Sequence, residues 1–303
     1  MDNIMRIESI STLHKIIGYE KPKHPLITLI DFKNLDTTNI NIDEKSMSYI
    51  ANYYMISLKN CTDCILKYGR KYYDFEEGSL IFTSPGQKLL VEGNPKNIDG
   101  WMLCFHPDLI RGSTLESKID EYSFFSYDTS EALHLSQKEK DIINNIANTI
   151  KLEYTQNIDV YSKDLIVSNI EVLLNYAKRF YGRQFITRTA INKDLIVKFE
   201  QILKNRFKDE LLEENGIPTV KELAMRMGYS TNYLGDLLKK ETGKSTQEHI
   251  QFMLLERAKS LLVGSNESVS QIAYSLGFEY PAHFSKFFKS KTGISPVQYR
   301  KIN

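Results

Sequence analysis

The sequence holds little cysteine, a single tryptophan and no long apolar run, and these shortages exclude whole classes of protein. Its 303 residues include 3 cysteines, which are too few for a disulfide framework and typical of a reducing compartment. No apolar run approaches the length that spans a bilayer, and the first residues lack the apolar core of a signal peptide. We therefore expect a cytoplasmic protein without a membrane segment.

Patterns typical of metal sites and catalytic sites are equally scarce. Cys61 and Cys64 have redox or zinc spacing, but no second pair completes a zinc site, so we interpret them as cysteines of a strand or its turn. A metal-dependent oxygenase barrel needs a His-x-His pair followed by a glutamate, whereas the early histidines are scattered at His14, His24, His106 and His134. The sequence predicts no metal site, no cofactor and no catalytic residue, which favours a protein that is not an enzyme.

The charge is nearly balanced over the whole chain but is distributed unevenly. The net charge is +1, and 42% hydrophobic with 25% charged residues is ordinary for a globular chain long enough for two domains. Up to residue 190 there are 22 lysines and arginines against 25 acids, and after it 17 against 13. Glu279 is the last acidic residue, and five basic residues follow it: Lys286, Lys289, Lys291, Arg300 and Lys301. This basic surface suits contact with phosphates.

The last third of the chain contains an internal repeat. The segment 220–229 recurs as 269–278, and the segment 234–243 recurs as 284–293. Each copy predicts a short helix, a glycine turn and a second helix, and two such units can place helices in successive major grooves of DNA. A solenoid is the structural alternative, but two copies are too few for one.

Capping patterns divide this region into seven predicted helices. Capping boxes at Thr219/Glu222, Ser245/Glu248, Ser268/Gln271 and Ser295/Gln298 each precede an apolar-periodic segment. Glycines stand where helices should end. The predicted helices are 194–208, 220–227, 231–241, 246–263, 269–276, 281–291 and a short one from Pro296. The long helix 246–263 should hold the two units at a fixed separation, so that they read grooves about 34 Å apart.

In the first copy, Leu234, Leu237 and Leu238 should be buried, which turns the opposite face of the helix outward. Asn232 could pair with adenine, Thr231 could contact a phosphate or a thymine methyl, and Lys239 should meet a phosphate. Asp236 could accept from cytosine N4 or pair with Lys240, and we favour the pairing.

In the second copy, Phe284, Phe287 and Phe288 should be buried, and the outward residues are Ala282, His283, Lys286 and Lys289. Lys286 is the best candidate for guanine O6 and N7, whereas Lys289 should meet phosphate. His283 could donate to a base or a phosphate, although a lone histidine is usually ordinary structure. Pro281 fits the first position of the helix, where no N–H is needed.

The C-terminal residues resemble the DNA-binding domain of the AraC/XylS family of bacterial transcription regulators. The similarity covers about residues 194–303 and is most specific in three segments: 269–278, 283–289 and 291–300. The resemblance implies base contacts from Asn232, Gly235 and Asp236 in the first unit and from Ala282, His283 and Lys286 in the second. Gly235 and Asp236 stand where larger polar or basic residues are common, so we expect the second unit to carry more of the affinity.

Short apolar runs separated by turn signals predict strands in the N-terminal half, at 25–32, 53–58, 64–68, 78–83, 88–91 and 100–105. Helices are predicted from Ser136 and over 160–181, and a lapse of periodicity around 183–193 predicts a linker. The segment 72–87 is similar to a strand pair of the cupin-like barrels that precede the DNA-binding domain in the same family. We thus expect an α+β chain of two domains. An N-terminal domain, 1–182, has an antiparallel barrel over about 20–125 and a helical hairpin over about 136–181; an all-α domain, 194–303, carries two helix-turn-helix units.

Aromatic residues of the predicted barrel either line an apolar pocket or form its core. Ligand contact is a candidate role for Tyr53, Phe82 and Trp101, with Tyr54 and Phe105 beside them. Two hypotheses for function remain: a transcription regulator whose barrel senses an effector or dimerises, and a cupin-type enzyme fused to a DNA-binding domain. A third possibility is that the barrel binds no ligand and that only the helical hairpin 136–181 acts, by mediating dimerisation. The expected partners are double-stranded DNA and RNA polymerase, with a small-molecule effector and a second copy of the chain as further candidates.

Overall fold

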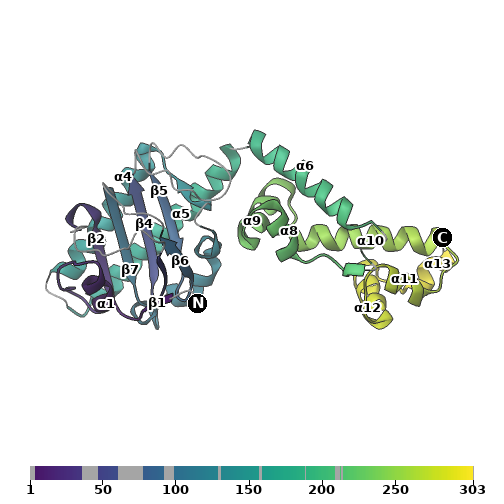
Figure 1. Cartoon of the computed structure of the whole chain (residues 1–303), viewed down its shortest axis with the longest axis horizontal. Coiled ribbons are helices and arrows are strands. Elements are labelled where there is room, and N and C mark those ends of the chain that lie inside the picture. Colours follow the sequence, from purple (N-terminus) through teal and green to yellow (C-terminus); the bar gives the residue numbers. More distant parts are fainter. Residues whose placement is uncertain are drawn as a thin grey trace. The chain divides into compact units, whose positions relative to one another are not determined.

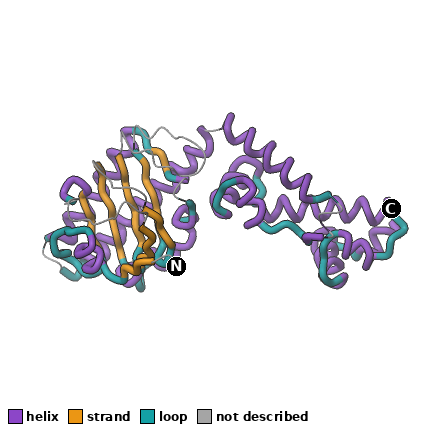
Figure 2. The backbone as a smooth tube through the Cα atoms, in the orientation of Figure 1, coloured by secondary structure: helices purple, strands orange, loops and turns teal. Residues whose placement is uncertain are grey.

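The computed structural model describes residues 4–35, 47–60, 78–91, 99–128, 131–156, 159–187, 189–208, 212 and 214–302. The chain divides into two compact units, Met1–Thr187 and Arg188–Asn303 (Figure 1). The N-terminal unit combines β-sheet with helices, whereas the described part of the C-terminal unit consists of helices joined by loops and turns (Figure 2). Cys61, Cys64 and the strand predicted at 64–68 lie outside the described residues.

A five-stranded antiparallel sheet forms the larger layer of the N-terminal unit, with strand order β2-β7-β4-β5-β8. Four of its strands confirm predicted ones, because alternating apolar runs bounded by turns are a local signal. The fifth, β8, was not predicted, since it is only two residues long. The strands are β2 (Ile27–Asp31), β4 (Tyr54–Asn60), β5 (Ser79–Thr83), β7 (Asp99–Phe105) and β8 (Leu133–His134).

A second sheet has three strands: β1 (Ile4–Ile7), β3 (Met47–Ala51) and β6 (Lys88–Val91). The prediction of a purely antiparallel β-domain is wrong here, because β1 pairs with β3 in parallel, with Ile4 opposite Ser48. Such a pairing joins distant segments, and apolar alternation carries no information about strand direction. The two sheets share one core of buried side chains: Ile7, Leu13, Ile30, Ala51, Tyr53, Met55 and Cys104.

Two long helices, α4 (Gln137–Thr155) and α5 (Ser162–Thr187), pack against each other, α4 also against β2 and α5 against β8. The N–H of Leu29 donates to the hydroxyl of Tyr154 at 2.8 Å, and the Trp101 indole N–H donates to Asn144 Oδ1 at 2.8 Å. Both bonds tie α4 to the five-stranded sheet. The shorter helices of this unit are α1 (Ile10–Ile16), η1 (Phe32–Asn34), α2 (Pro107–Ile110), α3 (Thr114–Lys118), η2 (Ile119–Glu121) and η3 (Ser123–Ser126).

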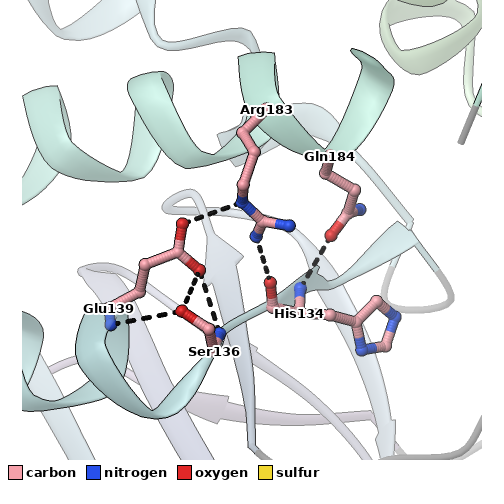
Figure 3. A network of polar contacts seen from close by, with 5 residues as sticks. All are labelled: His134, Ser136, Glu139, Arg183 and Gln184. Atoms are coloured by element: carbon pink, nitrogen blue, oxygen red, sulfur yellow. Dashed lines mark hydrogen bonds and ion pairs between the residues drawn. The ribbon is translucent and has the colours of Figure 1, made fainter. Parts of the chain in front are cut away.

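The segment predicted as a linker, 183–193, is helical on both sides of Arg188. A polar network holds the last turns of α5 (Figure 3): Arg183 donates to Glu139 Oε1 at 2.8 Å and to the His134 carbonyl at 2.7 Å. The His134 N–H donates to Gln184 Oε1 at 2.8 Å. The polar residues Arg183 and Gln184, which favoured a linker in the sequence, therefore form hydrogen bonds with β8 and with the start of α4. These partners could not be identified from the sequence.

The helices of the C-terminal unit follow the predicted order, with ends within about two residues of the predicted ones except for the first. They are α6 (Thr189–Arg206), α8 (Val220–Met227), α9 (Thr231–Thr242), α10 (Thr246–Gly264), α11 (Val269–Ser275), α12 (Pro281–Thr292) and α13 (Pro296–Ile302). Reciprocal capping boxes precede α10, α11 and α13 as predicted. The predicted box at α8 is half formed: Thr219 accepts from the Glu222 N–H, while the Glu222 carboxylate pairs with Arg206 and Arg226. No helix within the described ranges is long and apolar enough to cross a bilayer.

Candidate nucleic-acid interface

The first helix pair consists of α8 and α9, joined by a turn at Gly228. Gly228 ends α8 in the left-handed region, with φ +76°, and Ser230 caps α9 by accepting from the Tyr233 N–H. The three leucines predicted to be inside, Leu234, Leu237 and Leu238, are all buried. This packing fixes which face of α9 points outward.

The outward face of α9 carries the residues predicted for DNA contact. Thr231, Asn232, Lys239 and Lys240 are exposed, whereas Gly235 and Asp236 are partly buried. The side chains from Thr231 to Asp236 belong to the first turns of α9, which in a helix-turn-helix are the turns that reach base edges. The predicted Asp236–Lys240 pair stays a prediction.

The second helix pair consists of α11 and α12, joined by a turn at Gly277, with φ +81°. Phe284 and Phe288 are buried as predicted, but Phe287 is only half-buried and lies 5.8 Å, between ring centroids, from Phe278 at the turn. The residues predicted to face outward are all exposed: Ala282, His283, Lys286 and Lys289. The exposed ammonium groups of Lys286 and Lys289 give this face a positive charge.

One aromatic side chain on this face escaped the sequence analysis. Tyr280 precedes Pro281 at the N-cap of α12, is 58% exposed, and lies edge-on to His283 with a centroid separation of 5.4 Å. Its ring therefore restricts where the imidazole of His283 can lie. The signal was present in the sequence, since an aromatic residue stands where the first copy has the ordinary cap Ser230.

A buried arginine, also missed from the sequence, supports the first pair. Arg206 at the end of α6 is 3% exposed, and its Nε donates to Glu222 Oε1 on α8 at 2.9 Å. Its Nη2 donates to the carbonyls of Asn215 and Gly216 at 3.1 and 3.0 Å. A buried guanidinium needs such a full set of acceptors. No sequence spacing reveals this role, because the partners are 9 to 16 residues away.

Helix α10 contacts members of both pairs: α9 of the first, and α11 and α12 of the second. It is apolar on its inner face, with Ile250, Leu254, Ala258 and Leu262 buried. Near its start, His249 Nε2 lies 2.8 Å from Thr242 Oγ1 at the end of α9, and its ring is edge-on to Phe199. Burial lowers the pKa of His249 below its ordinary value of 6.5.

The three aromatic residues predicted to share a ligand pocket lie in three places. Tyr53 is buried in the core between the two sheets, where burial raises the pKa of its hydroxyl. Phe82 points to the opposite side of the five-stranded sheet and packs against Phe124, with a centroid separation of 4.4 Å. Trp101 is on the same side as Phe82 but lines a separate cavity. The pleat of the sheet and the strand order separate these side chains.

The cavity at Trp101 lies between the five-stranded sheet and α4 and has a volume of about 380 Å³. Trp101, Leu29 and Leu58 contribute apolar surface. The other lining residues are Asp31, Lys33, Asp99, Gly100, Asn144, Asn148 and Lys151, of which Lys33 and Asp99 form an ion pair at 3.3 Å. Across the described ranges, no group of three or more His, Cys, Asp or Glu is placed to hold a metal ion.

Comparison with known proteins gives a family match within the C-terminal unit and relatives that cover between about a quarter and three quarters of the chain. Residues 223–302 match a family model described as a helix-turn-helix domain. The uncharacterized HTH-type transcriptional regulator YisR of Bacillus subtilis is 34% identical over 84 residues, which cover 28% of this chain and 29% of YisR. The HTH-type transcriptional activator RhaS of Escherichia fergusonii is 25% identical over 256 residues, which cover 76% of this chain and 86% of RhaS.

A solved structure is similar over about a third of the chain. The C-terminal domain of the two-component response regulator YesN from Fusobacterium nucleatum is 27% identical. The match covers 35% of this chain and 98% of that domain, with a TM-score of 0.32. Against the first two curated relatives, the chain spans 29% and 34% of their length.

Proposed function

We propose that this chain, whose C-terminal unit is a DNA-binding domain of the AraC family, is a sequence-specific transcription regulator in which both helix pairs enter the major groove. One observation carries the proposal. At corresponding positions of the two copies, α9 and α12 bury an apolar face and expose a polar one. The outward set of Thr, Asn, His and Lys consists of side chains that can bind base edges and phosphates.

The two helices divide the work of recognition. On α12, Lys286 donates to guanine O6 and N7, His283 donates to a base or phosphate, and Ala282 leaves room for close approach. On α9, Asn232 pairs with adenine and Thr231 contacts a phosphate or a thymine methyl. Lys239, Lys240 and Lys289 are proposed to contact phosphates of the DNA backbone. Asp236 either pairs with Lys240 on α9 or accepts from cytosine N4.

The N-terminal unit is proposed to be a cupin-like sensing or dimerisation domain. Two sheets that share one apolar core support the cupin-like assignment. The cavity at Trp101, of about 380 Å³, falls within the range of small-molecule sites and supports a sensing role. RNA polymerase and a second copy of the chain are the proposed protein partners.

DNA selection tests the function directly. The full chain would be used to select duplexes from a random library, and its affinity for the selected duplex and for scrambled DNA would be measured at two salt concentrations. We expect about 10³-fold or greater preference for the selected duplex, and an affinity that falls steeply with salt. Equal affinity for both duplexes at every salt concentration would refute sequence-specific regulation.

Ligand binding by the N-terminal unit can be tested by tryptophan fluorescence, because Trp101 is the single tryptophan of the chain. A ligand that enters the cavity lies against its indole ring and should change its fluorescence. Screening small polar metabolites for a saturable change, and then for a change in DNA affinity, tests the sensing role. A saturable fluorescence change that leaves DNA affinity unaltered would separate ligand binding from regulation.

A further inference from the structure

The turn of the second helix pair packs directly on the segment that precedes the first pair, in which Leu212 and Asn215 are helical and Gly216 follows them. A Cβ at Gly277 would lie 2.9 Å from the Cα and the carbonyl carbon of Gly216, and 2.9 Å from the carbonyl oxygen of Leu212. All three atoms belong to the backbone, so they cannot swing aside as the end of a side chain can. The close approach of these two segments therefore requires glycine at position 277.

The segment on which Gly277 packs is itself fixed to the first pair. Its Gly216 N–H donates to the Leu212 carbonyl at 2.9 Å. Arg206 holds the carbonyls of Asn215 and Gly216, and the same guanidinium reaches Glu222 on α8. A continuous set of contacts thus runs from the turn of the second pair, through Gly216 and Arg206, to the first helix of the first pair.

The corresponding glycine of the first copy has no such requirement. Gly228 has φ +76°, close to the +81° of Gly277, so both backbones favour glycine to a similar extent. A Cβ at Gly228, however, would meet no atom of the described residues within 4 Å. The two glycines therefore differ in their contact with the other half of the domain, which only Gly277 makes.

We infer that Gly277 is a positioning residue that fixes the second helix pair relative to the first, so that the protein accepts one spacing between its two DNA half-sites. Helix α10 joins the pairs on one side, and the Gly216–Gly277 contact joins them at a second point. These two connections together prevent the rotation of one pair relative to the other that a connection through α10 alone would allow. The inference rests on the proposed function, because it concerns how two DNA-reading helices are held.

A fixed separation has a measurable consequence on DNA. One base pair inserted between the half-sites moves the distal site by about 3.4 Å and rotates it by about 35° around the helix. A domain with a fixed separation cannot follow this change and loses the contacts of one pair. A domain whose pairs move independently can follow it.

The test compares two substitutions that impose similar backbone strain. Gly277→Ala and Gly228→Ala would be measured with the wild-type full chain on three duplexes: the one that the wild type selects, the same with one base pair inserted between the footprinted half-sites, and one with a single half-site. The wild type and Gly228→Ala should bind the inserted duplex about tenfold more weakly than the selected one. For Gly277→Ala this penalty should fall to about threefold or less. Destabilisation alone would weaken binding to all three duplexes alike.

A second pair of variants covers the case in which Gly277→Ala does not fold, as judged by circular dichroism. Arg206→Lys cannot bind the carbonyls of Asn215 and Gly216 and the carboxylate of Glu222 at the same time, because an ammonium group lacks the planar, forked arrangement of donors that a guanidinium has. Arg226→Lys is its control, since Arg226 reaches the same carboxylate at 3.0 Å but is mostly exposed. Arg206→Lys should reduce the insertion penalty and Arg226→Lys should keep it.

The inference is overturned if the variants that disturb the contact keep the full penalty, or if the wild type tolerates the inserted base pair. Failure of the wild type to prefer any duplex would instead refute the proposed function. The two failures are distinguishable because the first is measured only on DNA that the wild type selects.

Discussion

The two helix pairs of the C-terminal unit are built on one plan and differ in core, cap and surface. The first has a leucine core and a hydrogen-bonded Ser230 cap. The second has buried phenylalanines, and its α12 begins with Tyr280 and Pro281 and has no side-chain capping bond among the described residues. Proline compensates for the absent cap, because its fixed φ suits the first helical position and it has no N–H to satisfy.

The surfaces differ more than the cores do. The outward face of α9 combines Thr231 and Asn232 with a glycine, an aspartate and two lysines, whereas that of α12 has His283 and two lysines and no acid. The comparison teaches that a helix-turn-helix scaffold constrains its inner face and leaves its outer face free. We propose that the second pair supplies most of the affinity and the first mainly discriminates between sequences.

The largest expected effect concerns the two cores. Phe288→Ala should lower the free energy of unfolding of the C-terminal unit by about 3–5 kcal/mol, and Leu238→Ala by about 2–5 kcal/mol, because both side chains are fully buried. Urea unfolding followed by far-ultraviolet circular dichroism measures both. The transition reported by Trp101 fluorescence is the internal control, since the single tryptophan lies in the other unit and should keep its midpoint. A loss below about 1 kcal/mol for either variant would contradict the assigned core.

The next effect concerns the basic surface of the second pair. Lys286→Ala should weaken binding to the selected duplex by about 1–3 kcal/mol and leave scrambled DNA little changed, because its contact is to a base. Lys289→Ala is the matched control, since loss of a phosphate contact weakens all sequences alike and reduces the salt dependence. Equal losses on both duplexes from Lys286→Ala would remove its base-reading role.

Substitution of a base-contacting residue in the first pair should weaken DNA binding less than Lys286→Ala does. Asn232→Ala should cost about 1 kcal/mol on the selected duplex, at the low end for a bidentate contact to adenine. The loss should fall on one base position, which a panel of single-base variants of the duplex would locate. A larger loss from Asn232→Ala than from Lys286→Ala would reverse the proposed division between the pairs.

The smallest effect is a pH dependence of stability at His249 on α10, where this helix contacts the end of α9. Burial lowers the pKa of His249 below 6.5, so below that pH the unfolded chain takes up a proton that the folded chain does not. Stability from this residue is therefore complete above pH 6.5 and declines as the pH falls through the lowered pKa. The second copy has Tyr299 in place of a histidine at the corresponding position. Unfolding midpoints at pH 7.5 and 5.5 should differ less in His249→Gln than in the wild type, and an unchanged difference would exclude His249 as the cause.

The sequence predicts the helical unit much better than the sheets, for a physical reason. Helices such as α8 and α10 are specified within about one turn at each end, by a cap, a glycine and an apolar period. The parallel pairing of β1 with β3 depends on segments far apart in the chain. The helical continuation of α5 past Gly182 depends on partners at His134 and Glu139 that no local pattern reveals.

The same distinction applies to the candidate sites. The outward residues of α9 and α12 followed from the helical period once the buried leucines and phenylalanines were recognised. Tyr53, Phe82 and Trp101 could not be grouped correctly, because the face of a strand residue depends on pairing register. The roles of Arg206 and Gly277 could not be predicted from the sequence, because both depend on contacts with the segment around Gly216, which lies between them in space.

A hydroxyl-radical footprint of the full chain on its selected duplex tests the central claim most directly. Two helix pairs held at a fixed separation should protect two patches about one helical turn apart, and Lys286→Ala should weaken one patch more than the other. A single protected patch, or two patches whose spacing varies from one selected duplex to the next, would contradict the claim that both pairs read DNA as one rigid unit.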